Sequence, residues 1–410
     1  MTRPRPSIFV LIAVVLLGGG MIGGVTLPTP AQAAQTVSAK VGKPLQEAQA
    51  LAKAGNYNGA IAKAKEAQAI TPRTAYEDFV INDFLAYVYT SKKDYKNAIT
   101  AYEAALKSAP AAEKGKRIKT LAQLSYQIRD YGKTITYANR YLKEIGPDAS
   151  LQLLVANCYY QQRSYQQALT SSKAIIDSAD SAGRAPSKAA LALYLSSAYQ
   201  LKDSASVKRA LFRLVELYPT DGYWTALIKQ VSGQGLSDYT SLDLRRLQLR
   251  LNLFKTGDEY FNMAKLAFAL NLPGDAKVIL EQGFQKKLLG SAPGERDQRL
   301  QKVVIEAAAK DLAGLQATDA AAAAGTSGDA DILAGQKYAS FGQYDKAITA
   351  INRGLARKTN GVVANPDQAK LELGRVLLQA GKTESGRKVL QSIKTEGGTR
   401  DVARLYLIAG

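Results

Sequence analysis

The stretch "FVINDFLAYVYTSKKDYKNAITAYEAALKSAP", residues 79–110, decides the fold predicted for this 410-residue chain. Leu85 and Tyr89 are spaced to lie on one face of a first helix, and Ala98 and Tyr102 on one face of a second. The polar letters SKKD between them are typical of a turn, and the closing proline cannot continue a helix. The stretch therefore predicts two helices joined by a tight turn.

The same skeleton recurs on both sides of this stretch. Tyr57, Tyr95, Tyr131 and Tyr165 each follow a short polar turn, and successive members of this set are 34 to 38 residues apart. A single helical hairpin cannot bury its apolar face alone, whereas similar hairpins stacked side by side bury a continuous core. The recurrence therefore predicts an all-α fold, an α-solenoid of helix-turn-helix repeats.

The spacing of these residues resembles that of the tetratricopeptide repeat (TPR). The family pattern is leucine with a small residue, an aromatic residue, a glycine-x-tyrosine turn, then alanines and a proline, over about 34 residues. The matching positions in two units are Leu85, Ala86, Tyr89, Tyr95, Ala98, Tyr102, Ala105 and Pro110, and Ala48, Leu51, Gly55, Tyr57, Ala60, Ala67 and Pro72. Further units follow along most of the chain. The resemblance implies the fold and says little about reaction chemistry.

The repeat pattern breaks between residues 220 and 256. There "VSGQGLS" interrupts a helix, and "SLDLRRLQLRLNLF" alternates leucine in the manner of a strand. We predict a helix for the second stretch, because an isolated strand would leave its backbone groups without partners. An alanine-rich run at 297–324 predicts a long helix. The predicted domains are a leader at 1–33, an N-terminal TPR array at 34–219, an irregular helical connector at 220–256 and a C-terminal TPR-like array at 257–410.

The first 33 residues have the pattern of a secretory signal. Arg3 and Arg5 precede an apolar run at 8–17, and the letters AQA that end at Ala33 have the form of a cleavage site. The pattern predicts cleavage after Ala33 and a periplasmic protein that is not stably inserted in a membrane. The alternative is an uncleaved anchor, since residues 8–25 reach the length of a bilayer span.

The chain carries a formal net charge of +19. Such a charge favours an acidic partner, anionic lipid headgroups or a cell-wall polymer. Export argues against nucleic acid, so no nucleic-acid partner is expected. Because lysine and arginine are spread along the whole chain, a solvated basic surface is the alternative interpretation.

The composition removes several kinds of chemistry. Histidine is absent and Cys158 is the single cysteine, so the chain has neither the commonest general base nor an intramolecular disulfide. We expect Cys158, within "ANCYY", to be a buried thiol rather than a nucleophile. No phosphate-binding loop or dinucleotide fingerprint occurs in a suitable context. We therefore expect no catalytic residue, no metal and no cofactor, although a Ser–Lys pair, which needs no histidine, stays open.

The resemblance to TPR proteins implies a binding groove on the concave surface, lined by the first helix of each unit. Amides suit the backbone of an extended peptide, tyrosines supply apolar area with a polar tip, and lysines attract acidic groups. Aligned by repeat position, the candidate partner-binding residues are Tyr87, Lys116, Lys119, Gln123, Tyr126, Gln127, Asn157, Tyr160, Gln161 and Gln200. The alternative is that these are ordinary solvated helix residues.

The later half is similar in its order of segments to periplasmic TPR proteins associated with TonB–ExbB–ExbD systems. The segments are "DGYW", the leucine-rich helix, "AFALNLPGDAKVILEQGF", "GQYDKAITAINRGL" and "DQAKLELGRVLLQAGKTESGRKVL". The resemblance implies an accessory role in outer-membrane transport. We therefore expect an exported, non-enzymatic scaffold that binds an envelope protein or peptide. The alternatives are a binder of anionic polymer or lipid and a Ser–Lys cell-wall hydrolase.

Overall fold

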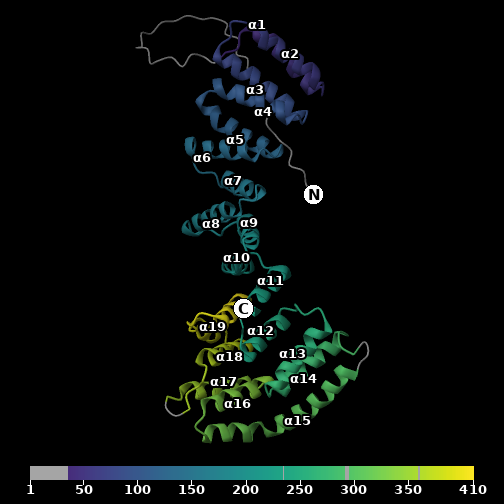
Figure 1. Ribbon diagram of the computed structural model, residues 1–410, viewed down its shortest axis with the longest axis vertical. Helices are drawn as coiled ribbons and strands as arrows, with labels where there is room; N and C mark the ends of the chain where they lie inside the picture. The colour runs from purple at the N-terminus through teal and green to yellow at the C-terminus, as the bar shows by residue number, and fades with distance from the viewer. Residues whose placement is uncertain (1–35, 234, 291–294, 359–360) are drawn as a thin grey trace, which may run out of the picture. The chain divides into compact units, whose positions relative to one another are not determined.

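The computed structural model describes residues 36–233, 235–290, 295–358 and 361–410, and in these ranges it contains twenty α-helices and no strand. The all-α prediction is confirmed. The helices are α1 (Ala39–Lys53), α2 (Tyr57–Ala69), α3 (Ala75–Ser91), α4 (Tyr95–Ser108), α5 (Ala111–Gln127), α6 (Tyr131–Glu144), α7 (Ala149–Gln161), α8 (Tyr165–Ser181), α9 (Lys188–Gln200), α10 (Ser204–Leu217), α11 (Asp221–Ser232), α12 (Asp238–Arg250), α13 (Gly257–Ala269), α14 (Pro273–Gln285), α15 (Glu295–Ala324), α16 (Gly328–Ser340), α17 (Tyr344–Ala356), α18 (Pro366–Gln379), α19 (Thr383–Gln391) and α20 (Gly398–Ala409) (Figure 1). The predicted leader and its cleavage site lie outside the described residues.

Grouped by their contacts, the residues form two compact units, which divide between Arg117 and Ile118. Both are α-solenoids of helical hairpins. The division into an N-terminal array at 34–219, a connector at 220–256 and a C-terminal array at 257–410 stays a prediction.

In unit 1, α3 and α4 form the hairpin expected from residues 79–110. Thr74 and Glu77 make a capping box at the start of α3, and Glu77 also accepts a hydrogen bond of 2.9 Å from the Ser38 amide. Burial opposes ionisation of Glu77, but hydrogen bonds from Ser38 and Thr74 lower its pKa to about 2. Ala86 and Ala98 are fully buried, so the small side chains do let the two helices approach closely.

The same turn recurs in unit 2 between α5 and α6, α7 and α8, and α9 and α10. Its second-last residue is Arg129, Arg163 or Lys202, each with a positive φ between 55° and 61°. In two of these turns the next residue caps the following helix: the Asp130 side chain accepts from the Lys133 amide at 2.9 Å, and Asp203 accepts from the Ser206 amide at 3.0 Å. The turn chemistry that defined the repeat in the sequence therefore sets the hairpin geometry.

The predicted connector is helical in the structure, as α11 and α12. The leucine-rich stretch is a helix rather than a strand, and Leu242 and Leu247 are fully buried. Trp224 of α11 joins the largest hydrophobic cluster, which also takes side chains from α8, α9, α10, α12, α18, α19 and α20. The connector thus contributes to the core of unit 2.

The last helices of unit 2 fold back onto its middle. Helices α18 and α20 pack against α12, and α20 also packs against α11 (Figure 1). Lys208 of α10 forms an ion pair of 2.6 Å with Asp401 of α20. Helices α12 to α20 therefore form a closed set, called here the C-terminal ring. The alanine-rich run is α15, a helix of 30 residues that joins α14 to α16.

None of the helices that the structure describes is both long enough and apolar enough to cross a bilayer.

Candidate functional site

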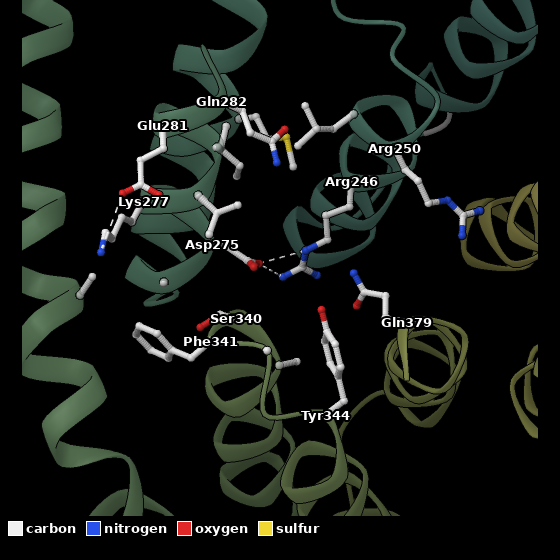
Figure 2. A pocket seen from close by; sticks show the side chains of 18 of the residues that line it. Arg246, Arg250, Asp275, Lys277, Glu281, Gln282, Ser340, Phe341, Tyr344 and Gln379 are labelled. Atoms are coloured by element: carbon white, nitrogen blue, oxygen red, sulfur yellow. Dashed lines mark hydrogen bonds and ion pairs between the residues drawn. The ribbon is translucent and has the colours of Figure 1, made fainter. Parts of the chain in front are cut away.

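The C-terminal ring contains a partly open hollow of about 840 Å³. Helices α12 to α18, together with α20, contribute its lining, so the return of α18 and α20 to α12 completes it. Figure 2 shows side chains entering it from several of these helices. Its lining falls into two parts of different chemistry.

A group of apolar residues on α14 and α15 lines part of the hollow, beside the Lys277–Glu281 ion pair of α14, and we call this group the apolar wall. It consists of Val278 on α14 and of Ile305, Ala308, Ala309 and Leu312 on α15. The four α15 residues follow the spacing of one helix face. Val278, Ile305 and Leu312 are 45%, 44% and 49% exposed, which is high for aliphatic side chains. Grouped exposed apolar side chains mark binding surfaces in soluble proteins.

The other part of the lining is polar, and we call it the polar wall. Arg246 of α12 donates from Nε to the Asp275 carboxylate of α14 at 3.0 Å, and its Nη2 bonds the same oxygen. Gln282, Tyr344 and Gln379 also line the hollow, from α14, α17 and α18 (Figure 2). Guanidinium, amide and hydroxyl groups there can orient a polar segment.

An ionic cluster lies beneath the polar wall and joins α12, α14 and α18. Its carboxylates are Asp243, Asp275 and Glu372, and its guanidiniums are Arg246 and Arg375. Arg246 Nη1 lies 2.6 Å from Asp243 and 3.3 Å from Glu372, and Arg375 bonds Glu372 from Nη2. The Asp243 side chain is 0% exposed. We call these five residues the α12–α18 cluster.

The cluster shifts the pKa values of two of its carboxyl groups, Asp243 and Glu372, in opposite directions. Burial and the charge of Glu372 raise the pKa of Asp243 to about 7. Burial opposes ionisation of Glu372 as well, but Arg375 and Arg246 lower the pKa of Glu372. One of two neighbouring carboxyl groups is therefore held ionised, while the other favours its proton.

A second buried cluster joins α15, α16 and α17. Asp331, whose side chain is 0% exposed, forms ion pairs with Arg353, at 2.6 Å, and with Arg357. Arg353 also donates a hydrogen bond to Asp319 of α15. This α15–α17 cluster has two carboxylates for two guanidiniums. It is balanced in charge, unlike the α12–α18 cluster.

Ser340 and Lys337 make structural contacts, and Cys158 is buried. Ser340 lines the hollow, but its Oγ donates to the Lys337 carbonyl at 2.7 Å, while the Lys337 ammonium bonds Asp311. Burial raises the pKa of the Cys158 thiol to about 11, so it is mostly protonated near neutral pH. No group of three or more His, Cys, Asp or Glu within the described ranges is arranged to hold a metal ion.

The predicted groove residues lie on the expected helices, and several of them pack within their own hairpin. The Tyr126 ring lies 5.8 Å from that of Tyr131, and the Tyr160 ring 5.3 Å from that of Tyr165. Asn157 donates to the Leu153 carbonyl at 3.0 Å. These tyrosines therefore have a structural role at the hairpin turn.

Lys119 is engaged as well: its ammonium bonds Asp148 and lies 5.9 Å from the centre of the Tyr141 ring. Tyr87 and Lys116 belong to unit 1 and the other eight candidates to unit 2. Helices α7 and α9 are in contact, which makes Asn157, Tyr160, Gln161 and Gln200 members of neighbouring helices. The exposed candidates are Tyr87, Lys116, Gln123, Gln127, Gln161 and Gln200. Their role in binding stays a prediction.

The hollow was not predicted from the sequence. Its polar wall depends on charges placed three apart within leucine-rich stretches, Asp243 with Arg246 and Glu372 with Arg375. Charged residues on a helix that is expected to be buried are a signal of internal ion pairing. That signal does not reveal that α18 meets α12, because the two helices are more than a hundred residues apart.

Comparison with known proteins identifies the repeat in part of the chain. Residues 81–111, which cover most of the α3–α4 hairpin, match the family model described as tetratricopeptide repeat. No curated protein matches the chain in sequence. The match identifies one tetratricopeptide repeat within a chain that folds as an α-solenoid of TPR-like hairpins.

Solved structures with similar folds are distant. A tetratricopeptide repeat protein from Parabacteroides merdae is 12% identical, with a TM-score of 0.36 over 65% of this chain and 100% of its own. YrrB, described as a TPR protein with an unusual peptide-binding site, is 17% identical, with a TM-score of 0.34 over 45% of this chain and 88% of its own. The C-terminal part of a TPR repeat-containing protein from Cytophaga hutchinsonii is 12% identical, with a TM-score of 0.33 over 77% of this chain and 95% of its own. At these values they add nothing about binding.

Proposed function

We propose that this chain is an exported, non-enzymatic scaffold of the cell envelope that holds a segment of a partner protein in the hollow of its C-terminal ring. The observation that carries the proposal is the exposure of Val278, Ile305 and Leu312 in the lining of a hollow that also has a polar wall. An occupant with an apolar side chain and polar flanks matches both walls.

Two contributions would hold the occupant. Burial of apolar surface on Val278, Ile305 and Leu312 contributes about 25 cal/mol per Å². Gln282, Tyr344 and Gln379 offer hydrogen bonds to a peptide backbone. Because the ring is closed by α18 and α20, these groups are already in place, which reduces the entropy lost on binding.

The envelope location is part of the proposal and rests on the signal-like pattern of residues 1–33. The accessory role in a TonB–ExbB–ExbD system rests on the order of segments in the later half. N-terminal sequencing of the protein from an envelope fraction tests the location, and we expect Ala34 as the first residue. A chain that retains Met1 or Thr2 would contradict it.

Site-specific photo-crosslinking tests the hollow. A photoreactive amino acid replaces Leu312 in one variant and Val303 in another; both residues are 49% exposed on α15, but only Leu312 lines the hollow. We expect one discrete partner adduct from position 312, which mass spectrometry identifies, and none from position 303. Leu312→Glu should abolish binding of that partner, and Val303→Glu should not. Adducts of equal yield at both positions, or at neither, would refute the assignment.

The net charge of +19 favours one second candidate, the binding of an anionic envelope polymer. Such binding should weaken steeply as salt rises, because surface charges are screened. Binding in the hollow should change less. A polymer pull-down that is salt-sensitive and unaffected by Leu312→Glu would favour this second candidate.

A further inference from the structure

The α12–α18 cluster has more acids than bases. Three carboxylates, Asp243, Asp275 and Glu372, are linked to two guanidiniums, Arg246 and Arg375. Asp243, Glu372 and Arg375 are almost completely buried. If every member were ionised, the cluster would hold one more negative than positive charge, and two of its three carboxylates, Asp243 and Glu372, would be ionised out of contact with water. Buried charges that lack a partner are costly, and a carboxyl group in that position tends to take up a proton.

Asp243 is the member at which a proton is best accommodated, because its side chain is fully buried and hydrogen-bonds the ionised Glu372 carboxylate, to which a protonated Asp243 can donate. Its oxygens also accept hydrogen bonds from Arg246 Nη1 at 2.6 Å and from Gln368 Nε2 at 3.1 Å, which favour the ionised form, but burial and the charge of Glu372 outweigh them. Arg375 Nε lies 3.1 Å from Asp243 Oδ1 but makes no hydrogen bond there. Asp275 is also less buried than Asp243, with 20% of its side chain exposed.

The other groups that face Asp243 do not supply the missing positive charge. Tyr406 of α20 is neutral and donates from Oη to the Asp243 backbone carbonyl at 2.8 Å. Thr240, on the same helix as Asp243, is also neutral. Arg250 is exposed at the edge of this region, where it lies 5.4 Å from the centre of the Tyr406 ring and donates to the Gly410 carbonyl. Solvent screens its charge.

We propose that Asp243 carries a proton in the closed C-terminal ring, and that loss of this proton weakens the junction of α12 with α18. The ring would then close tightly at mildly acidic pH and loosen as the pH rises to neutrality. The raised pKa of Asp243, about 7, agrees with the charge count.

The sign of the effect follows from linkage. The pKa of Asp243 in the folded ring is above its ordinary value of 3.8, so the folded ring binds more protons than the opened one between these two values. Its stability therefore falls as the pH rises toward about 7 and changes little above that. The chain has no histidine, so no imidazole titrates in this range.

The junction affects the hollow directly, because Arg246 and Arg375 belong to both the cluster and the hollow lining. If the proposed function is correct, capture of a partner would be weaker at neutral than at acidic pH. That consequence rests on the proposed function, whereas the proton on Asp243 does not. The experiment below uses the chain alone, so the two proposals fail separately.

Hydrogen exchange of the full chain between pH 5 and 8, corrected for intrinsic rates, measures opening at α12 and α18. We expect the opening equilibrium constant of the wild type to rise with pH up to about 7, by at most about tenfold per unit for one proton, and then to level off. Asp243→Asn keeps the shape of the neutral carboxyl group. It should abolish this dependence and hold the opening constant at pH 8 at or below that of the wild type.

Asp331→Asn is the matched control, because Asp331 is equally buried but belongs to the balanced α15–α17 cluster. It should increase opening of α16 and α17 at every pH, with no added slope between pH 5 and 7. An infrared band of a protonated carboxyl group at pH 6 should be present in the wild type and in Asp331→Asn, and absent from Asp243→Asn. The proposal is overturned if the wild type shows no slope at α12 and α18, if the slope persists in Asp243→Asn, or if Asp243→Asn opens as readily at pH 8 as Asp331→Asn does.

Discussion

The α3–α4 hairpin of unit 1 and the C-terminal ring of unit 2 are both built from α-helices, but the contacts between their helices differ in kind. In the hairpin, the helices meet over small apolar side chains such as Ala86 and Ala98. In the ring, α12 and α18 meet over buried ions, and α16 and α17 meet where Gly335 faces Ile351. A hairpin of local contacts needs only its own sequence. A ring needs a specific partner helix, and the buried ions and close glycine contacts supply that specificity.

The largest expected effect is at the ions of the ring. Arg375→Met leaves Asp243 and Glu372 buried with one guanidinium fewer, and breaking a buried ionic network in this way costs about 3 to 5 kcal/mol. Urea unfolding followed by circular dichroism should show this loss. Lys63→Met, which removes an exposed ion pair with Glu47 between α1 and α2, should leave the curve unchanged. If Arg375→Met and Lys63→Met lowered the free energy of unfolding equally, the ring would not depend on buried ions more than the hairpins of unit 1 do.

Glycine packing should give the next largest effect. A Cβ at Gly335 would lie 2.5 Å from Ile351 Cγ1 and 2.9 Å from the Ala347 carbonyl, so Gly335→Ala should cost about 1 to 3 kcal/mol. Gly314 of α15 has nothing within 4 Å of its Cβ position, and Gly314→Ala should instead stabilise by up to about 1 kcal/mol. Thermal unfolding of the two variants should shift in opposite directions, and a shift in the same direction would contradict the close contact.

The same contrast explains what could be predicted from the sequence. The hairpins were predictable because turn residues, alanines and tyrosines lie within about 34 residues of one another, and the leucine-rich stretch at α12 was correctly placed in a helix. The hollow was missed because it depends on contact between α12 and α18, which no local pattern encodes. The sequence predicts that Tyr126 and Tyr160 line a groove, and in the structure each also packs against a tyrosine of its own hairpin.

A smaller effect is expected at the repeated turn. Asp130→Ala removes a side-chain cap from α6 and should cost about 1 kcal/mol. Ser164 occupies the same position before α8 but makes no side-chain cap, so Ser164→Ala should change the stability by only a few tenths of that. Denaturant midpoints of the two variants give this comparison. If the two substitutions lower the stability equally, the hydrogen bonds of the Asp130 cap do not stabilise the hairpin.

The smallest effect concerns Cys158, a buried residue of α7. Because burial raises the pKa of its thiol to about 11, a thiol reagent at pH 8 should label the native chain far more slowly than the urea-unfolded chain. Raising the pH from 5 to 7 should raise the opening constant of the ring but leave this labelling rate, once corrected for thiolate fraction, unchanged. An accelerated rate would mean that the ring and the hairpins open together.

The return of α18 to α12 also sets an order of events during folding. Arg246 and Glu372 are 126 residues apart, so α12 is synthesised long before the helix that completes its cluster exists. The hairpins of unit 1 can close at once, whereas α12 has to wait for a long loop to close. During that wait its charges are hydrated and keep a leucine-rich helix from associating with other chains. The charged residues that become buried ions in the folded ring thus first oppose aggregation of the incomplete chain.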